Sequence, residues 1–349
     1  MYFETKKIKK TLIAGGFSTA FFVCPTFAED DIRLNTINSD RPQVNISGLL
    51  ETEVGFSNTK SSGDTNRSSD TVLATIELHF DAHLSDMVRG HIMLLHEEDD
   101  TPMEFDEGTI EIGKDEGFSL TTGQMYLPFG VFDTNMVSDP MTLEMGETRE
   151  SAILLSYKLN GASGSVYLFN GNIHKSDATK LEHKGFRVAY EKRQLSVGLD
   201  YISSIAESEV LQAALLDSNP ALTVTTYLPI DKFIAATAVH AIYHGDTFSI
   251  IVERVAAVKK FAATDGGLAN KKPITGNVEL AYHFSPYNIA MGLQGSKDAE
   301  GLFAKQKVLV GASRNIFKKV GLNVELAKTT EYDNTITDTT LTAQLAIEF

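Results

Sequence analysis

Ionisable side chains recur at every second position in several stretches of this chain. In one stretch, Glu77 and His79 alternate with Ile76, Leu78 and Phe80. Period-two alternation is typical of a β-strand with one apolar and one polar face. Burying many charges in a protein core is costly, so we expect the polar faces to line water. The chemistry they indicate is electrostatic attraction or repulsion of passing solutes, as in the rings of charge that line a pore.

The candidate pore-lining residues fall into two groups, one on the polar faces of predicted strands and one in residues 128–150. The first group is Glu77, His79, Arg89, His91 and Arg187, and the same faces are predicted to carry Asp81, Glu111, Glu191, Asp200, His240, Glu253, Glu279, His283, Glu325 and Glu348. The second group is Asp133, Asp139, Glu144, Glu147, Arg149 and Glu150.

Residues 128–150 form a long connection that we interpret as a constriction loop folded into the lumen. Pro128 ends a strand because it lacks the N–H that the ladder needs. Phe129 follows it, and Gly130 allows the chain to bend inward. The alternative is a solvated surface loop, and the sequence alone does not decide between the two.

Sequence signatures of catalysis and of metal binding are missing. The nine His are scattered and form no H-E-x-x-H motif, and the chain has neither G-x-S-x-G nor a P-loop. The acidic residues between 97 and 107 lack the ligand spacing and central Gly of an EF-hand loop, which favours an acidic outer loop. We therefore predict no enzyme, no catalytic residue, no metal site and no cofactor, and keep a barrel enzyme or adhesin as an alternative.

Strand-like segments follow one another along the chain with a regular rhythm. Longer loops alternate with tight turns, which predicts an all-β, transmembrane antiparallel β-barrel of about 16 strands with short periplasmic turns and long outer loops. Helical spacing is confined to residues 207–216, within a long connection. The predicted strands are residues 43–57, 71–83, 88–97, 107–114, 118–127, 151–159, 164–172, 182–191, 194–204, 232–242, 247–258, 274–284, 287–296, 303–314, 319–328 and 341–349.

The remaining organisation follows from the two ends of the chain and its charge. Residues 1–28 have the basic, apolar and small-residue regions of a signal peptide. Residues 29–42 are expected to be a short N-terminal segment, and residues 43–349 a single barrel. The alternating strand Leu341–Phe349 is predicted to pair with residues 43–57 and close the barrel. A net charge of -15 argues against a nucleic-acid partner. Cys24, inside the signal segment, is the only cysteine, so no disulfide is expected.

The segment Gly123-Gln124-Met125-Tyr126-Leu127-Pro128-Phe129-Gly130 is similar to the G-x-x-x-x-P-F-G segment of phosphate-selective-type porins, where a strand enters the constriction loop. With the strand layout and the chain length, the whole predicted barrel resembles the LbtU-type siderophore porin family. The resemblance implies a bacterial outer-membrane channel without a plug that takes up ferric siderophore. No binding residue is carried over from that family.

Two channel functions are therefore expected, and the sequence leaves both open. One is selective uptake of ferric siderophore, along a path lined by the basic residues Arg89, Arg149, Arg187, Lys305 and Lys307. The other is general diffusion of small hydrophilic solutes with a preference for cations, which the acidic charge favours. Expected partners are the solute, outer-membrane lipid and the barrel-assembly machinery through Phe349, and the channel is expected to be a monomer or a trimer.

Overall fold

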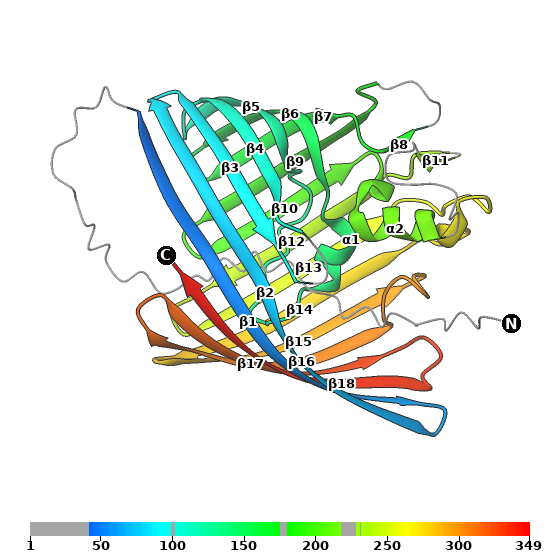
Figure 1. Cartoon of the computed structure of the whole chain (residues 1–349). Coiled ribbons are helices and arrows are strands. Elements are labelled where there is room, and N and C mark those ends of the chain that lie inside the picture. Colours follow the sequence, from blue (N-terminus) through cyan, green and yellow to red (C-terminus); the bar gives the residue numbers. More distant parts are fainter. Residues whose placement is uncertain (1–41, 99–101, 175–179, 218–227, 231) are drawn as a thin grey trace, which may run out of the picture.

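Sixteen strands close into one antiparallel barrel in the computed structural model (Figure 1), which describes residues 42–98, 102–174, 180–217, 228–230 and 232–349. The predicted all-β barrel is therefore confirmed. The predicted signal peptide lies outside the described residues, and so does nearly all of the segment 29–42. The strands of the barrel are β1 (Gln43–Ser61), β2 (Asp64–Ser85), β3 (Val88–His96), β4 (Glu104–Gly113), β5 (Gly117–Tyr126), β6 (Arg149–Leu159), β7 (Ala162–Phe169), β9 (His183–Lys192), β10 (Leu195–Ile202), β12 (Ala236–His244), β13 (Phe248–Ala257), β14 (Ile274–Phe284), β15 (Tyr287–Lys297), β16 (Gln306–Phe317), β17 (Val320–Thr330) and β18 (Ile336–Glu348).

One end of the barrel carries only tight turns. The turns from β2 to β3, β4 to β5, β6 to β7, β9 to β10, β12 to β13, β14 to β15 and β16 to β17 each use two or three residues. Short turns face the periplasm in outer-membrane barrels, so we refer to this end as the periplasmic end. The longer connections, including the one predicted for residues 128–150, lie at the opposite, outer end.

The predicted loop at residues 58–70 is wrong. The structure extends β1 to Ser61, starts β2 at Asp64 and joins them through Ser62 and Gly63 alone. Both turn residues have positive φ angles, 46° and 97°, which is what a two-residue hairpin turn of type I′ requires. The polar composition that predicted a loop belongs instead to two strands that are exposed to water. The alternation of long and short connections therefore fails at this first outer connection.

The two faces of the wall differ as the alternation predicts. On β18, the side chains of Leu345 and Ile347 are 39% and 36% exposed. Gln344, on the opposite face of the same strand, is 3% exposed. The strand also closes the barrel as predicted, because it pairs with β1 from Leu49↔Glu348 to Ser61↔Ile336. The exposed apolar side chains form the outer surface, which suits contact with lipid.

Short helices fill the outer end of the barrel. They are α1 (Met141–Gly146), the 3-10 turns η1 (Ile205–Glu207) and η2 (Gly266–Leu268), and α2 (Glu209–Asp217), which confirms the helical spacing near residue 211. A two-stranded sheet, β8 (Ile173–His174) with β11 (Leu228–Pro229), lies beside them (Figure 1). No helix in the described ranges is long and apolar enough to cross a membrane.

The outer-end helices share a hydrophobic cluster with the barrel wall. Phe129 and Met145 from the connection after β5 pack with Ile205 and Leu211 of the later connection and with Leu268 of η2. All five side chains are at most 1% exposed. Connections that are far apart in sequence are thus joined into one packed layer, and α1 contacts α2 within it.

Candidate functional site: the inner loop and the pore wall

The connection after β5 turns into the barrel at Pro128–Gly130. We call residues 127–148 the inner loop. Gly130 has a φ of 88°, and a Cβ there would lie 2.2 Å from the Phe132 ring, so the position suits glycine. The Gly130 N–H donates to Asp200 Oδ2 over 2.8 Å, and its carbonyl accepts from Arg187 Nη1 over 3.2 Å. The loop therefore meets the inner wall at its fourth residue, through both the N–H and the carbonyl of Gly130.

Glu253 on β13 provides the next attachment point. Its Oε1 accepts the Val131 N–H over 2.7 Å, and its Oε2 accepts the Phe132 N–H over 3.1 Å. The hydroxyl of Thr142, in α1, donates to the same Oε2 over 2.9 Å. One carboxylate thus holds the loop at two places eleven residues apart. Hydrogen bonds to a charged acceptor are stronger than neutral ones, which favours a fixed loop.

Two further carboxylates continue this attachment along the wall. Glu279 on β14 accepts from the Thr134 hydroxyl and the Asn135 N–H, each over 2.7 Å. Glu325 on β17 accepts from the N–H groups of Val137 and Ser138 over 2.9 and 3.1 Å. We call Asp200, Glu253, Glu279 and Glu325 the anchor carboxylates.

Apolar packing supports the loop between the anchors. Met136 is 5% exposed and packs against Ala281, Ala290, Leu309 and Ala327 on four neighbouring strands.

The hydrogen bonds of the inner loop reach the wall from β9 to β17, and none within the described ranges reaches β1–β4. The loop lies inside the barrel against one wall, so the surface-loop alternative does not describe it. Its role as the constriction stays a prediction.

The predicted loop residues have different surroundings. Asp133 pairs with a histidine of the wall: its Oδ2 lies 2.6 Å from Nε2 of His244 on β12. Asp139 is 3% exposed, and both its carboxylate oxygens lack a hydrogen-bond partner among the described residues. Glu144 and Glu147, which follow Asp139 in the loop, are half-buried. Burial, followed by the neighbouring acids, raises the pKa of Asp139 and of Glu147 well above the ordinary value, and burial raises the pKa of Glu144.

Arg149 and Glu150 lie at the start of β6 rather than in the loop. Arg149 Nη1 donates to Glu104 Oε1 over 2.8 Å and also to Asp106 Oδ1. Its charge is therefore balanced by two carboxylates on β4. Glu150 Oε1 accepts from Asn172 Nδ2 over 3.3 Å. Arg149 thus joins β6 to β4, and Glu150 joins β6 to the connection that follows β7.

The predicted residues on β2 and β3 do come together. His79 Nε2 lies 3.1 Å from Glu77 Oε2, and the ring of His79 lies 5.6 Å from that of His91. Arg89 donates to Glu111 over 2.8 Å and to Asp115 as well. Arg187, in contrast, lies on β9, five strands along the wall from β3, and its Nε lies 3.7 Å from Asp200 Oδ1. No group of His, Asp and Glu within the described part of the chain is placed to hold a metal ion.

Sequence reasoning placed the anchor carboxylates on the lumen face but missed what they do. Alternation assigns a side chain to a face, yet it does not say which distant backbone N–H groups will meet that side chain. A run of loop residues with unpaired N–H groups opposite a row of carboxylates is the signal that could have suggested the attachment.

Comparisons with known proteins agree with this architecture. A family model for Gram-negative porins matches residues 18–335. A UPF0422 protein of Legionella pneumophila (strain Lens) is 25% identical over 322 residues, covering 83% of this chain and 60% of the relative. A UPF0422 protein of Coxiella burnetii is 24% identical over 315 residues, covering 84% and 65%. The chain thus spans less than two thirds of the length of these relatives.

Solved structures share the fold. The outer-membrane channel DcaP of Acinetobacter baumannii is similar with a TM-score of 0.63 at 15% identity, covering 88% of this chain and 98% of DcaP. OmpF of Salmonella typhi, solved with daunomycin, has a TM-score of 0.60 at 13% identity, covering 90% and 99%. The fold is that of an outer-membrane porin barrel. The chain belongs to the Gram-negative porin family.

Proposed function

We propose that the protein is a diffusion channel for small hydrophilic solutes that prefers cations. The observation that carries the proposal is the one-sided position of the inner loop. Its anchors lie on β10, β13, β14 and β17, which leaves the inner faces of β1–β4 uncovered by loop hydrogen bonds. The open passage therefore runs along that wall.

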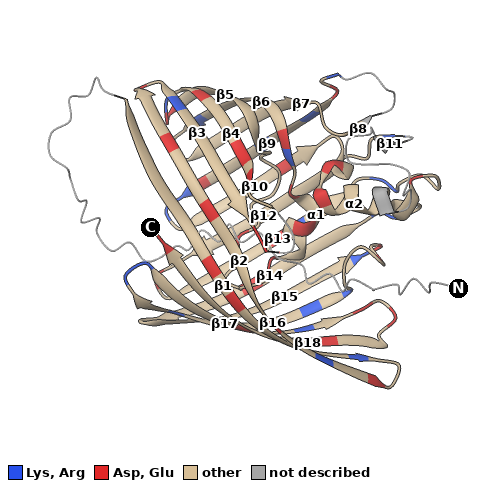
Figure 2. Cartoon of the chain, in the orientation of Figure 1, with Lys and Arg blue, Asp and Glu red and all other residues tan. Residues whose placement is uncertain are grey.

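The uncovered wall is acidic (Figure 2). Its inward side chains include Glu51, Glu53, Glu77, Asp81, Glu107 and Glu111. The guanidinium of Arg89, on the same wall, is paired with Glu111 and with Asp115. Carboxylates that outnumber free cations along a water-filled passage raise the local concentration of cations and repel anions.

The test is conductance of the purified, refolded protein in planar bilayers. A cation-preferring pore gives a stable conductance and, under a KCl gradient, a reversal potential of the sign set by K⁺. A reversal potential of the opposite sign contradicts the preference, and the absence of conductance contradicts the channel itself.

Selective uptake of ferric siderophore is the second candidate, and it rests on the resemblance of the whole barrel, in its strand layout, its chain length and residues 123–130, to the LbtU-type siderophore porin family. Arg149 and Arg187 were expected along its path. Each now has an acidic neighbour, Glu104 and Asp106 for Arg149 and Asp200 for Arg187, so neither offers a free charge to an anionic complex. Block of the conductance by low concentrations of ferric siderophore supports selective uptake. Uptake that is indifferent to Arg149→Ala and Arg187→Ala counts against a path along these residues.

Oligomeric state and assembly also belong to the proposal. One solved neighbour, OmpT of Vibrio cholerae, is described in a trimer form and has a TM-score of 0.54 at 13% identity. We propose a trimer in outer-membrane lipid, inserted by the barrel-assembly machinery through Phe349. Light scattering of the detergent-solubilised protein measures the mass, and deletion of Phe349 is expected to impair insertion into membranes.

A further inference from the structure

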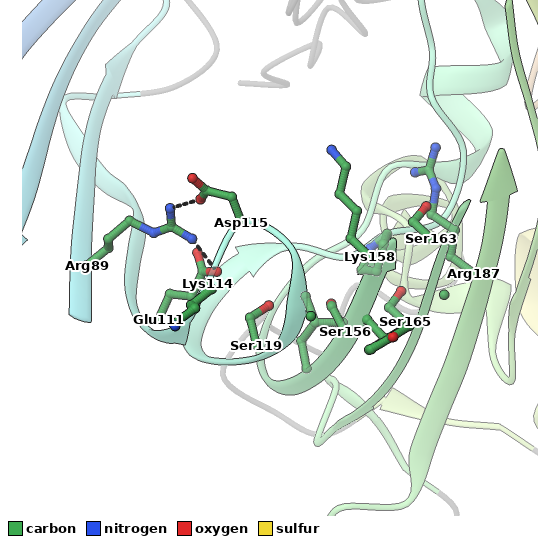
Figure 3. Close-up of a pocket in the computed structure, with 15 residues that line it drawn as sticks. Arg89, Glu111, Lys114, Asp115, Ser119, Ser156, Lys158, Ser163, Ser165 and Arg187 are labelled. Atoms are coloured by element: carbon green, nitrogen blue, oxygen red, sulfur yellow. Dashed lines mark hydrogen bonds and ion pairs between the residues drawn. The ribbon is translucent and has the colours of Figure 1, made fainter. Parts of the chain in front are cut away.

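A cavity of about 480 Å³ opens on the inner wall at the periplasmic end. A row of residues that pair across neighbouring strands lines it. Ser119 on β5 pairs with Ser156 on β6, Ser156 pairs with Ser165 on β7, and Ser165 pairs with Arg187 on β9. Cross-strand partners share a face of the sheet, so the three hydroxyls and the guanidinium line the cavity together (Figure 3).

The three hydroxyls are available to a solute. Ser119, Ser156 and Ser165 are half-exposed, and the side chain of none of them bonds to another residue in the ranges that the structure describes. Each hydroxyl can donate one hydrogen bond and accept two. Spaced one strand apart, about 5 Å, they form a row of donors and acceptors that can bind several hydroxyls of one polyol.

Two lysines add positive charge at the rim of this row. Lys114 lies in the turn between β4 and β5, and Lys158 lies on β6 and stands between Asp115 and Arg187 (Figure 3). Neither lysine forms an ion pair with any carboxylate of the described chain, whereas the Arg89 guanidinium is bound by Glu111 and Asp115. Within the described chain, the lysines are thus the cations of the cavity that no carboxylate pairs, since Arg187 also lies near an acid, Asp200.

We propose that this cavity is a binding subsite for an anionic polyol, that is, a solute with several hydroxyls and one phosphate or carboxylate group. The serine row binds the hydroxyls, and Lys114 and Lys158 bind the anionic group. The inference rests on the proposed channel function and adds a solute class to it. Pro128 borders the cavity, so a bound solute lies directly beneath the start of the inner loop.

The position of the subsite predicts sidedness. An anion that arrives from the outer end must first pass Glu51, Glu53 and Glu77 of the acidic wall. One that arrives from the periplasmic end meets Glu111 and Asp115, whose charges are paired with Arg89, beside the lysines. Binding should therefore narrow the passage and reduce the current at lower concentrations when the solute is added at the periplasmic end.

The experiment measures block of single-channel current by glucose 6-phosphate, gluconate, glucose and orthophosphate, added to either side of the bilayer. We expect glucose 6-phosphate or gluconate to block best, and from one side. The pair Lys114→Gln, Lys158→Gln should raise the half-blocking concentration about tenfold. The pair Ser156→Ala, Ser165→Ala should weaken block by the anionic polyols and leave that by orthophosphate unchanged. Lys192→Gln, on an exposed periplasmic residue outside the cavity, is the matched control.

Calorimetric titration of the folded protein with glucose 6-phosphate and with gluconate provides a readout that does not need a current. If the protein conducts and neither solute blocks or binds, the subsite is wrong and the channel function stands. If it does not conduct but binds glucose 6-phosphate or gluconate in a lysine-dependent way, the subsite stands without the channel. If the anionic polyols bind equally well to the wild type and to the lysine variant, the inference is wrong. If orthophosphate binds to the wild type as well as the anionic polyols do, the polyol part of the inference is wrong.

Discussion

Glu325 holds Ser138 by two hydrogen bonds at once. Its Oε1 accepts from the Ser138 hydroxyl over 2.7 Å, and its Oε2 accepts from the Ser138 N–H over 3.1 Å. This contact attaches the middle of the inner loop to β17, which lies ten strands from β5 along the wall that carries the other anchor carboxylates. A flexible connection is thereby fixed across the inside of the barrel by one carboxylate and one serine.

Neutralising an anchor should loosen the loop. Glu253→Gln leaves one carbonyl oxygen for three donors and places an amide NH₂ against a backbone N–H group, so we expect a loss of about 2–4 kcal/mol in loop attachment. Current noise and proteolytic cleavage between residues 127 and 148 should both increase. Glu191→Gln is the control, because Glu191 is an exposed residue of β9 without a hydrogen bond to the loop. Unchanged noise and cleavage in Glu253→Gln contradict the anchoring role.

Closure of the barrel should be sensitive to Gly48. A Cβ at Gly48 would lie 2.5 Å from the Phe349 ring and 2.7 Å from the Glu77 carbonyl oxygen. Backbone oxygen cannot move away cheaply, so Gly48→Ala should destabilise the barrel by about 1–3 kcal/mol. Gly55→Ala on the same strand meets nothing within 4 Å and serves as control. The temperature at which the folded band on SDS gels is lost measures the difference, and equal temperatures for the two variants contradict it.

The buried acids predict that the second half of the inner loop, residues 139–147, is more stable at acidic pH. Burial raises the pKa of Asp139, Glu144 and Glu147 above the ordinary values of 3.8 for Asp and 4.5 for Glu. A carboxyl with a raised pKa binds its proton more tightly in the folded state. Its effect on stability is therefore fully present below the ordinary pKa, and stability falls as pH rises toward the raised value.

Asp139→Asn isolates this effect from that of other groups. The amide stays neutral at every pH, so the variant should lose less loop stability than the wild type when the pH is raised from about 5 to about 8, both above the ordinary pKa of a carboxyl group. Proteolysis of the inner loop at the two pH values gives the comparison. A wild-type loop that becomes more resistant at pH 8, with no change in Asp139→Asn, is the contrary outcome.

Ion preference should depend on the open wall and not on the anchors. Glu77→Gln and Glu53→Gln each remove a negative charge from an inward position on β2 and β1. The double variant should lower the ratio of cation to anion permeability by about twofold or more, since charges that line a pore set its selectivity. Reversal potentials measured before and after the change test this. Glu348→Gln, an exposed residue at the end of β18, is expected to have a smaller effect.

The sequence by itself determined the barrel. Alternation along β18, with Leu345 and Ile347 outward and Gln344 inward, depends only on the two-residue period of a strand and on the need to separate lipid from water. The same local rule predicted the tight turns and the helix near Leu211. It misjudged residues 58–70, because water-exposed strands carry the same polar residues as a loop, and only the paired positive φ angles of Ser62 and Gly63 complete the hairpin.

Only the tertiary structure decided which charges act together. Arg149 is bound by Glu104 and Asp106, and Val131 by Glu253, because strand order and register bring residues more than forty positions apart within hydrogen-bond distance. Periodicity within a segment carries no information about the distance between segments. The face of each charge could thus be predicted from its neighbours in sequence, but its partner depends on the closed barrel and on the path of the loop inside it.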